Sequence, residues 1–179
     1  MDTKTWIHNY KKKFILYRAM PNSLENCKEY GDIFKIVKRN VKEVLGTERV
    51  GFMLILSELP AGVAAMHYMG SNSIVLNKSV VKSLNVIEKA KEKRNYVIYD
   101  LLLHEYIHTL GYVDERTVRS LCWKICEKTF GKDHLTTKMA YQGLGKIYPE
   151  LAWVKPSASF YNSAEIVNGF DTDNISYIA

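Results

Sequence analysis

The chain has 179 residues, of which 47% are hydrophobic and 25% are charged, and it carries a formal net charge of +6 at pH 7. This is typical of one globular domain with a proper core. No apolar run approaches the roughly 20 residues of a membrane-spanning helix, and the N-terminus is too polar for a signal peptide, so we expect a cytoplasmic protein. Cys27, Cys122 and Cys126 do not resemble a disulfide framework and are expected to be buried.

The positive charge raises the question of nucleic-acid binding. The sequence has no zinc-finger spacing, no aromatic RNA-binding motif and no helix-turn-helix pattern, so nucleic acid is not the expected partner. The charge is also uneven, because residues 150–179 hold Lys155 against four acidic residues, a net charge of −3 that leaves +9 on the preceding residues. The sequence does not indicate an oligomeric state.

The N-terminal quarter of the chain has helical periodicity. Residues 4–20 place apolar and aromatic side chains on one side of a helix, and Pro21 then interrupts it. A second helix is expected from about residue 23 or 26 to Leu45, where Gly46 ends it. We assign residues 1–45 as an N-terminal helical extension.

Short segments rich in β-forming residues follow this extension. Residues 50–56 predict a buried strand, and two runs on either side of a Gly-Ser-Asn turn predict a β-hairpin at about 63–77. A helix at about 79–93 comes next. Strands followed by helices indicate an α+β fold with a small, mostly antiparallel sheet.

The helix expected at about 96–110 carries the chemistry. Asn95 is a plausible N-cap, and Gly111 is suited to the C′ position. Within it lies the pattern H-E-x-x-H, formed by His104, Glu105 and His108. The two histidines are one turn apart and can aim both imidazoles at one metal ion. Glu105 lies about 100° round the helix, where it can act as general base toward the water that the metal activates.

Two further helices are expected after this one. Asp114 and the acidic residue after it mark a new helix start, and that helix ends at Gly131. Another helix is expected from about 133 to 148. From Pro149 onward the periodicity vanishes, which predicts an extended C-terminal tail. We therefore divide the chain into one metallopeptidase-like domain at 1–149, with its catalytic core at 50–148, and a tail at 150–179.

A catalytic zinc usually takes a third protein ligand, and four downstream residues are candidates for it. Asp114 gives the pattern H-E-x-x-H-x-x-G-x-x-D, which resembles that of the metzincins, but it is also a good helix N-cap, and Glu115 shares this ambiguity. Glu127 follows His108 at a distance similar to that in thermolysin-like gluzincins. His134 is favoured here, because imidazole is the commonest ligand type among the four.

The α+β body, the hairpin before the H-E-x-x-H helix and a histidine third ligand resemble the minigluzincins, a group of small soluble prokaryotic metallopeptidases. The resemblance covers about residues 50–148 and implies a zincin-like fold with Zn²⁺ held by His104, His108 and His134. It also implies latency, since minigluzincins are described as zymogens closed by their C-terminal segments. Here the acidic tail at 150–179 is the candidate inhibitor.

These expectations describe a zinc-dependent peptidase that acts on a peptide or protein substrate. Glu105 is its general base, and the edge of the hairpin is the surface on which extended substrate would pair. The alternative is a non-catalytic protein of the same fold that regulates or binds a partner. A basic nucleic-acid binder is the third option, which salt-dependent retention on DNA would support.

Overall fold

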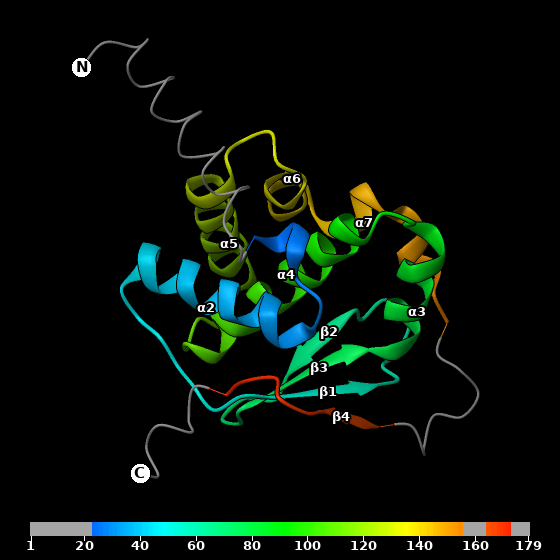
Figure 1. The fold of residues 1–179 in the computed structure, drawn as a ribbon, viewed down its shortest axis with the longest axis horizontal. Helices are drawn as coiled ribbons and strands as arrows, with labels where there is room; N and C mark the ends of the chain where they lie inside the picture. Colours follow the sequence, from blue (N-terminus) through cyan, green and yellow to red (C-terminus); the bar gives the residue numbers. More distant parts are fainter. Residues whose placement is uncertain (1–22, 156–163, 173–179) are drawn as a thin grey trace.

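A four-stranded sheet lies beneath a layer of helices (Figure 1). The structure is a computed structural model that describes residues 23–155 and 164–172. The helices of these residues are α2 (Tyr30–Leu45), α3 (Lys78–Ile87), α4 (Lys91–Thr109), α5 (Glu115–Phe130), α6 (Leu135–Gln142) and α7 (Leu144–Ile147), with two 3-10 turns, η1 (Leu24–Asn26) and η2 (Pro149–Trp153). The strands are β1 (Met53–Ser57), β2 (Ala65–His67), β3 (Ser73–Asn77) and β4 (Glu165–Val167). This confirms the α+β class.

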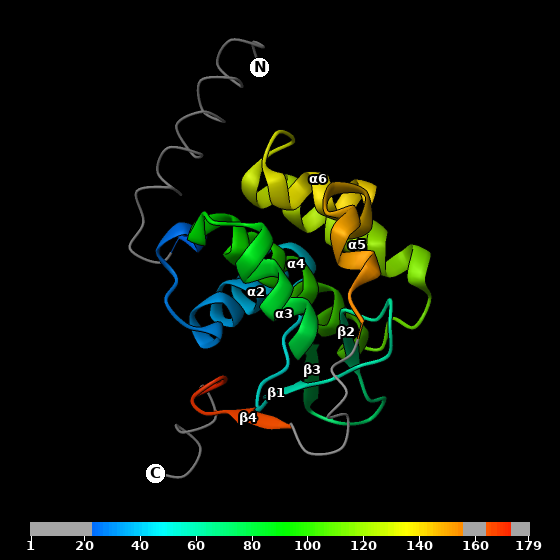
Figure 2. The ribbon, with the colours of Figure 1, turned by 90° about the vertical axis from the view of Figure 1, so that its right-hand side faces the viewer.

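The sheet has the strand order β2-β3-β1-β4. The predicted hairpin is present, with β2 antiparallel to β3, and the predicted strand at 50–56 is β1. The sheet is mixed, because β1 runs parallel to β3 while β4 runs antiparallel to β1. In the described chain β2 and β4 are therefore the two edges, and Figure 2 shows them on opposite sides of the sheet beneath the helices.

One face of the sheet builds the core with the helices. Register pairs Leu54 with Ile74 and Leu56 with Leu76, and all four side chains are buried. They alternate with residues of the opposite face, as the two-residue period of a strand requires. The helical layer therefore packs on the face that carries these leucines and isoleucine.

Helix α4 lies at the centre of the fold. It packs against α2, α5, α6, η1 and the strands β2 and β3, so apolar side chains are buried on nearly every side of it. The expected N-cap Asn95 is wrong: α4 begins at Lys91, and Asn95 lies inside it, where its amide donates to the carbonyls of Leu24 and Cys27 at 2.8 and 3.0 Å. Asn95 therefore joins α4 to η1.

Helix α2 ends at Leu45, as predicted. Gly46 follows it with a φ of 72°, a left-handed conformation that stops the helix. The start of α2 is later than predicted. Asp32 accepts hydrogen bonds from the backbone N–H groups of Lys28 and Glu29 at 3.0 and 3.2 Å, which defines the first turn of α2. The helix predicted at 4–20 lies outside the described residues.

The helix expected at 133–148 is divided. It ends at Gln142, because Gly143 has a φ of 90°, and the chain continues as the short α7 and then η2. Gly131 ends α5 as predicted. The three cysteines are free and buried, also as predicted.

The described part of the C-terminal tail belongs to the fold. Residues 165–167 form β4, Phe170 stacks on Phe34 with ring centroids 4.3 Å apart, and Asp171 forms a buried ion pair with Lys38. The Asp171 carboxylate also accepts from the backbone N–H groups of Gly51 and Phe52. The sequence pattern missed this strand because only three residues pair. No helix in the described ranges is long and apolar enough to cross a membrane.

Candidate metal centre

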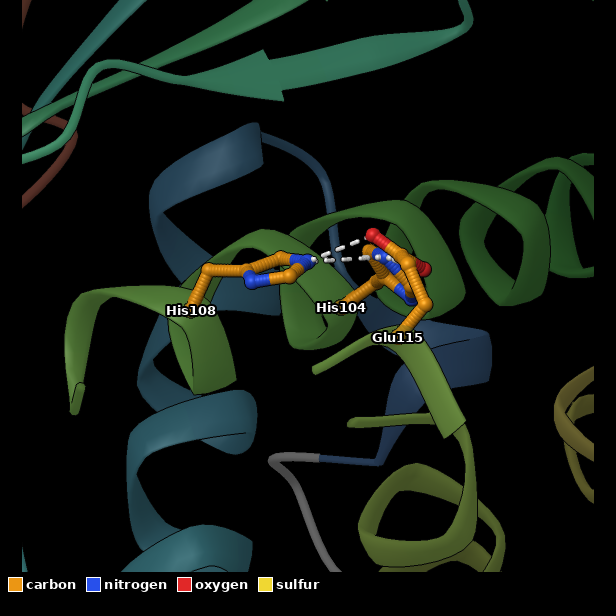
Figure 3. A group of neighbouring side chains, drawn as sticks. All are labelled: His104, His108 and Glu115. Carbon is orange, nitrogen blue, oxygen red and sulfur yellow. Dashed lines mark hydrogen bonds and ion pairs between the residues drawn. The ribbon is translucent and has the colours of Figure 1, made fainter. Parts of the chain in front are cut away.

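Three side chains from two helices converge at one end of α4. Nε2 of His104 lies 3.2 Å from Nε2 of His108. The carboxylate of Glu115, the first residue of α5, lies 3.4 Å from Nε2 of His104 and 3.1 Å from Nε2 of His108. Figure 3 shows the two rings and the carboxylate turned toward a common point. Among the described residues, His104, His108 and Glu115 form a group whose ligand atoms lie close enough together to hold a metal ion.

The spacing of these atoms fits one small cation. Ligands at about 2.0–2.1 Å from a tetrahedral ion lie about 3.3 Å from one another. The three distances between 3.1 and 3.4 Å are close to this value. Two imidazole nitrogens and one carboxylate are also a donor set that leaves a position open at a tetrahedral ion.

The tautomer of His108 is set by the chain that follows it. Its Nδ1 lies 2.8 Å from the backbone carbonyl oxygen of Tyr112, which can only accept, so Nδ1 carries the proton. In the neutral ring Nε2 is then the lone-pair nitrogen, and it is the atom that faces His104 and Glu115. Metal-ligating histidines commonly donate their other ring N–H to a backbone carbonyl in this way.

A tight turn brings Glu115 back to the two histidines. The N–H of Gly111 donates to the carbonyl of His108 at 3.0 Å, and the φ of 96° at Gly111 reverses the chain. Asp114 then caps α5, its carboxylate accepting from the N–H and the hydroxyl of Thr117 at 2.8 and 2.7 Å. These hydrogen bonds lower the pKa of Asp114. Because Asp114 caps the helix, Glu115 is the acidic residue that faces the histidines.

The C-terminal turn of α4 is fixed from the other side by the segment before β1. The hydroxyl of Tyr106 accepts from the N–H of Arg49 at 2.7 Å and donates to its carbonyl at 2.9 Å. The Arg49 guanidinium donates to the carbonyl of Thr109, one of the last carbonyls of α4. These contacts hold the part of α4 that carries His104 and His108.

Electrostatics at His104 favour the neutral imidazole. Burial lowers the pKa of His104. The negative charge of Glu115 opposes this shift, and the positive charges of His108 and Arg119 add to it. A histidine ligand must be unprotonated to bind a cation. The arrangement is therefore compatible with metal binding near neutral pH.

Glu105 lies beside the group without belonging to it. The residue is buried, with 8% of its surface exposed, and burial, with a smaller effect from Glu115, raises the pKa of its carboxyl to about 7. It contacts both of the cavities that adjoin the group. A carboxyl with such a pKa can both accept and release a proton near neutral pH.

Two cavities meet at the group. The larger, of about 570 Å³, extends between β2, α4 and the helices α5 to α7. The smaller, of about 380 Å³, extends along β2 toward Met69 and Val113. Both are lined by Ala65, His104 and Glu105. The group therefore lies where two hollows adjoin, with β2 along one wall.

His134, the favoured third ligand, is placed elsewhere. It is the N-cap of α6, and its Nδ1 accepts from the N–H of Thr136 at 3.2 Å. Its ring stacks on Phe130 and meets Tyr96 edge to face, with centroid distances of 4.8 and 4.6 Å. The structure brings Glu115, not His134, to the two histidines, because the α4–α5 turn returns the chain within seven residues.

The remaining candidates have other surroundings. Glu127 lies 3.7 Å from Lys132 in an ion pair near the end of α5. His67 lies on β2 in the wall of the smaller cavity, with Nδ1 3.2 Å from the carbonyl of Ser73. Tyr141 is exposed and packs against Trp123. Tyr112 contributes its backbone carbonyl to His108.

Sequence reasoning missed two charged residues of the larger cavity. Asp100 lies one turn before His104 on the same face of α4, and Arg119 lies one turn after Glu115 on α5. The four-residue spacing from known site positions would have identified both. Burial raises the pKa of Asp100 to about 7, against the opposing effect of the Arg119 charge.

No protein-family model matches the chain, and no curated protein and no solved structure matches it either.

Proposed function

We propose that this protein is a zinc-dependent peptidase of the gluzincin type, with His104, His108 and Glu115 as the metal ligands and Glu105 as the general base. The observation that carries the proposal is the convergence of two Nε2 atoms and a carboxylate within 3.4 Å of one another, beside a buried glutamate. Glu115 replaces His134 as the proposed third ligand. A glutamate from the helix after H-E-x-x-H resembles the gluzincin ligand set.

Zinc suits this donor set because two imidazoles and one carboxylate occur in catalytic zinc sites, where the ion acts as a Lewis acid and lowers the pKa of water. Glu105 takes the proton of the attacking water as its oxygen bonds to the substrate carbonyl carbon. It then delivers that proton to the departing amine nitrogen as the C–N bond breaks. The pKa of about 7 suits both steps.

The edge of β2 supports binding of an extended peptide. In the described chain β2 pairs with β3 alone, so its other side carries unpaired backbone groups, and it borders both cavities at the metal group. A peptide added there as a further strand gains backbone hydrogen bonds that do not depend on its sequence. Its scissile bond would then pass His104 and Glu105.

The proposal is tested by metal content and hydrolysis together. The full chain, purified and loaded with one equivalent of Zn²⁺, is incubated with an unfolded protein, and new N-termini are counted. Glu105→Gln should retain zinc and lose at least about a hundredfold in rate, the size of a general-base contribution. Glu92→Gln, an exposed position on the same helix, is the matched control.

Two outcomes would reject the proposal. Wild-type protein that binds no divalent ion would remove the metal centre. Zinc-loaded protein that cleaves no peptide bond would favour the non-catalytic alternative, in which the ion stabilises the junction of α4 and α5.

A further inference from the structure

The larger cavity contains a carboxylate that no described residue pairs with. Asp100 lies in its wall, one turn of α4 away from His104, and forms no hydrogen bond or ion pair within the part of the chain that the structure describes. Asp100 is half-buried and lines the cavity, and a partly desolvated carboxylate is stabilised by an opposite charge. An unpaired one beside a metal group indicates a position for an external cation.

The cavity wall combines apolar side chains with polar ones, among them the cations Arg119 and Lys146. Leu101 lies next to Asp100 on α4, Cys122 comes from α5, and Met139 and Leu144 come from α6 and α7. The volume of about 570 Å³ is ample for one long side chain. Lysine and arginine combine an apolar stem with a charged head, so the apolar part of the walls suits the stem while the carboxylate receives the head.

Arg119, the cation whose charge acts on Asp100, does not pair with it directly. Arg119 acts on Asp100 only through its charge, and its side chain is 62% exposed. Its Nε lies 4.0 Å from the carboxylate of Glu115, one turn earlier on α5. Arg119 lines the same cavity but forms no hydrogen bond or ion pair with Asp100, so the Asp100 oxygens have no direct cationic partner among the described residues.

We propose that the larger cavity binds a lysine or arginine side chain of the peptide substrate, adjacent to the bond that is cleaved, with Asp100 as the residue that recognises its charge. The inference rests on the proposed peptidase function, because it deepens the same site. The unpaired carboxylate, the apolar part of the walls and the shared border at His104 and Glu105 carry it.

The test measures binding apart from cleavage. Zinc-loaded Glu105→Gln protein is titrated with fluorescent peptides that are identical except for one central residue, which is arginine, citrulline or glutamate. Citrulline has the shape of arginine without its charge. The arginine peptide should bind at least about tenfold more tightly than the citrulline peptide, as a charge-assisted hydrogen bond predicts.

Substitution at Asp100 supplies the specific readout. Adding Asp100→Asn should bring the arginine and citrulline peptides to equal affinity, whereas Asp100→Glu should keep most of the difference. Adding Glu92→Gln, at an exposed site of the same helix, should leave the difference unchanged. If Asp100→Asn does not fold, the Asp100→Glu and citrulline comparisons still decide the result.

The outcomes separate the two proposals. Wild-type hydrolysis without preference for lysine or arginine at any position would overturn the Asp100 inference and leave the peptidase standing. Charge-selective binding that depends on Asp100, with no hydrolysis, would retain the pocket and reject the peptidase. Equal affinity for the arginine and citrulline peptides, tighter binding of the glutamate peptide, or no binding of any peptide would overturn the inference.

Discussion

The carboxylate of Glu115 lies 3.1 Å from Nε2 of His108, across the turn that joins α4 to α5. The residue before Glu115 is also acidic, yet Asp114 is turned to the helix end and caps it. The two adjacent carboxylates therefore have different roles: Asp114 caps α5, and Glu115 contacts the histidines. The direction of each side chain at the start of α5 determines this.

This relationship predicts which substitutions remove the metal. Glu115→Ala should weaken zinc binding by more than the roughly 10–100-fold that loss of an outer-shell partner causes, since it deletes a ligand. His134→Asn should leave zinc affinity unchanged, because His134 lies outside the proposed ligand set. Asparagine also keeps a capping acceptor at the start of α6, so the helix should be preserved. Competition with a chromophoric chelator measures both.

If His134→Asn releases zinc and Glu115→Ala does not, the ligand set proposed from the α4–α5 turn is wrong.

Asp100 predicts a pH dependence of stability in the metal-free protein. Its pKa rises from 3.8 to about 7 on folding, so between these values the folded state retains a proton that the unfolded state releases. Stability is therefore lost as pH rises from about 4 to about 7. Asp100→Asn should raise the melting temperature at pH 8 by at least about 3 °C, the effect of about 1 kcal/mol, and by little at pH 4.

Thermal unfolding with a chelator present, at both pH values, checks this sign. A variant that is stabilised equally at pH 4 and pH 8 would show that removal of the charge is not the cause.

The ion pair between Lys38 and Asp171 predicts that the C-terminal tail stabilises the fold. Both side chains are almost fully buried, at 3% and 1% exposure. Asp171→Asn removes the negative charge of this buried ion pair, and we expect it to cost about 3–5 kcal/mol. The matched control is Glu165→Gln, which breaks the more exposed pair with Lys78 on the same segment and should cost less than about 1 kcal/mol.

Chemical denaturation of the two variants gives the comparison. The same contacts bear on the proposed latency, since removal of the chain after residue 149 deletes β4 and Asp171 together. Such a truncation should unfold the protein at moderate temperature and give no gain in activity. A truncated protein that folds and cleaves faster would restore the inhibitory role of the tail.

The turn after α4 predicts a link between backbone strain and metal affinity. Gly111 has a φ of 96°, and no atom lies within 4 Å of an added Cβ, so Gly111→Ala strains the backbone without a steric clash. The cost should be roughly 1–2 kcal/mol. Zinc affinity should fall as well, because the turn places Glu115. Gly70→Ala, at a similar φ of 81° and equally open, is the control that should leave zinc affinity unchanged.

The sequence by itself determined the features that depend on short-range patterns. The spacing of His104 and His108 placed both rings on one face of a helix, and Gly46, Gly111 and Gly131 ended helices where they were predicted to. The hairpin of β2 and β3 followed from its turn residues. These features are local, since each depends on residues only a few positions apart.

Tertiary structure decided the rest. It placed Glu115 rather than His134 beside the two histidines, made Asn95 a buried tie to η1, and paired Lys38 with Asp171 across 133 residues of sequence. Each of these depends on where a side chain points after helices and strands have packed. Residue type and spacing define candidates for a contact, but long-range packing selects among them, because buried polar groups must find partners in three dimensions.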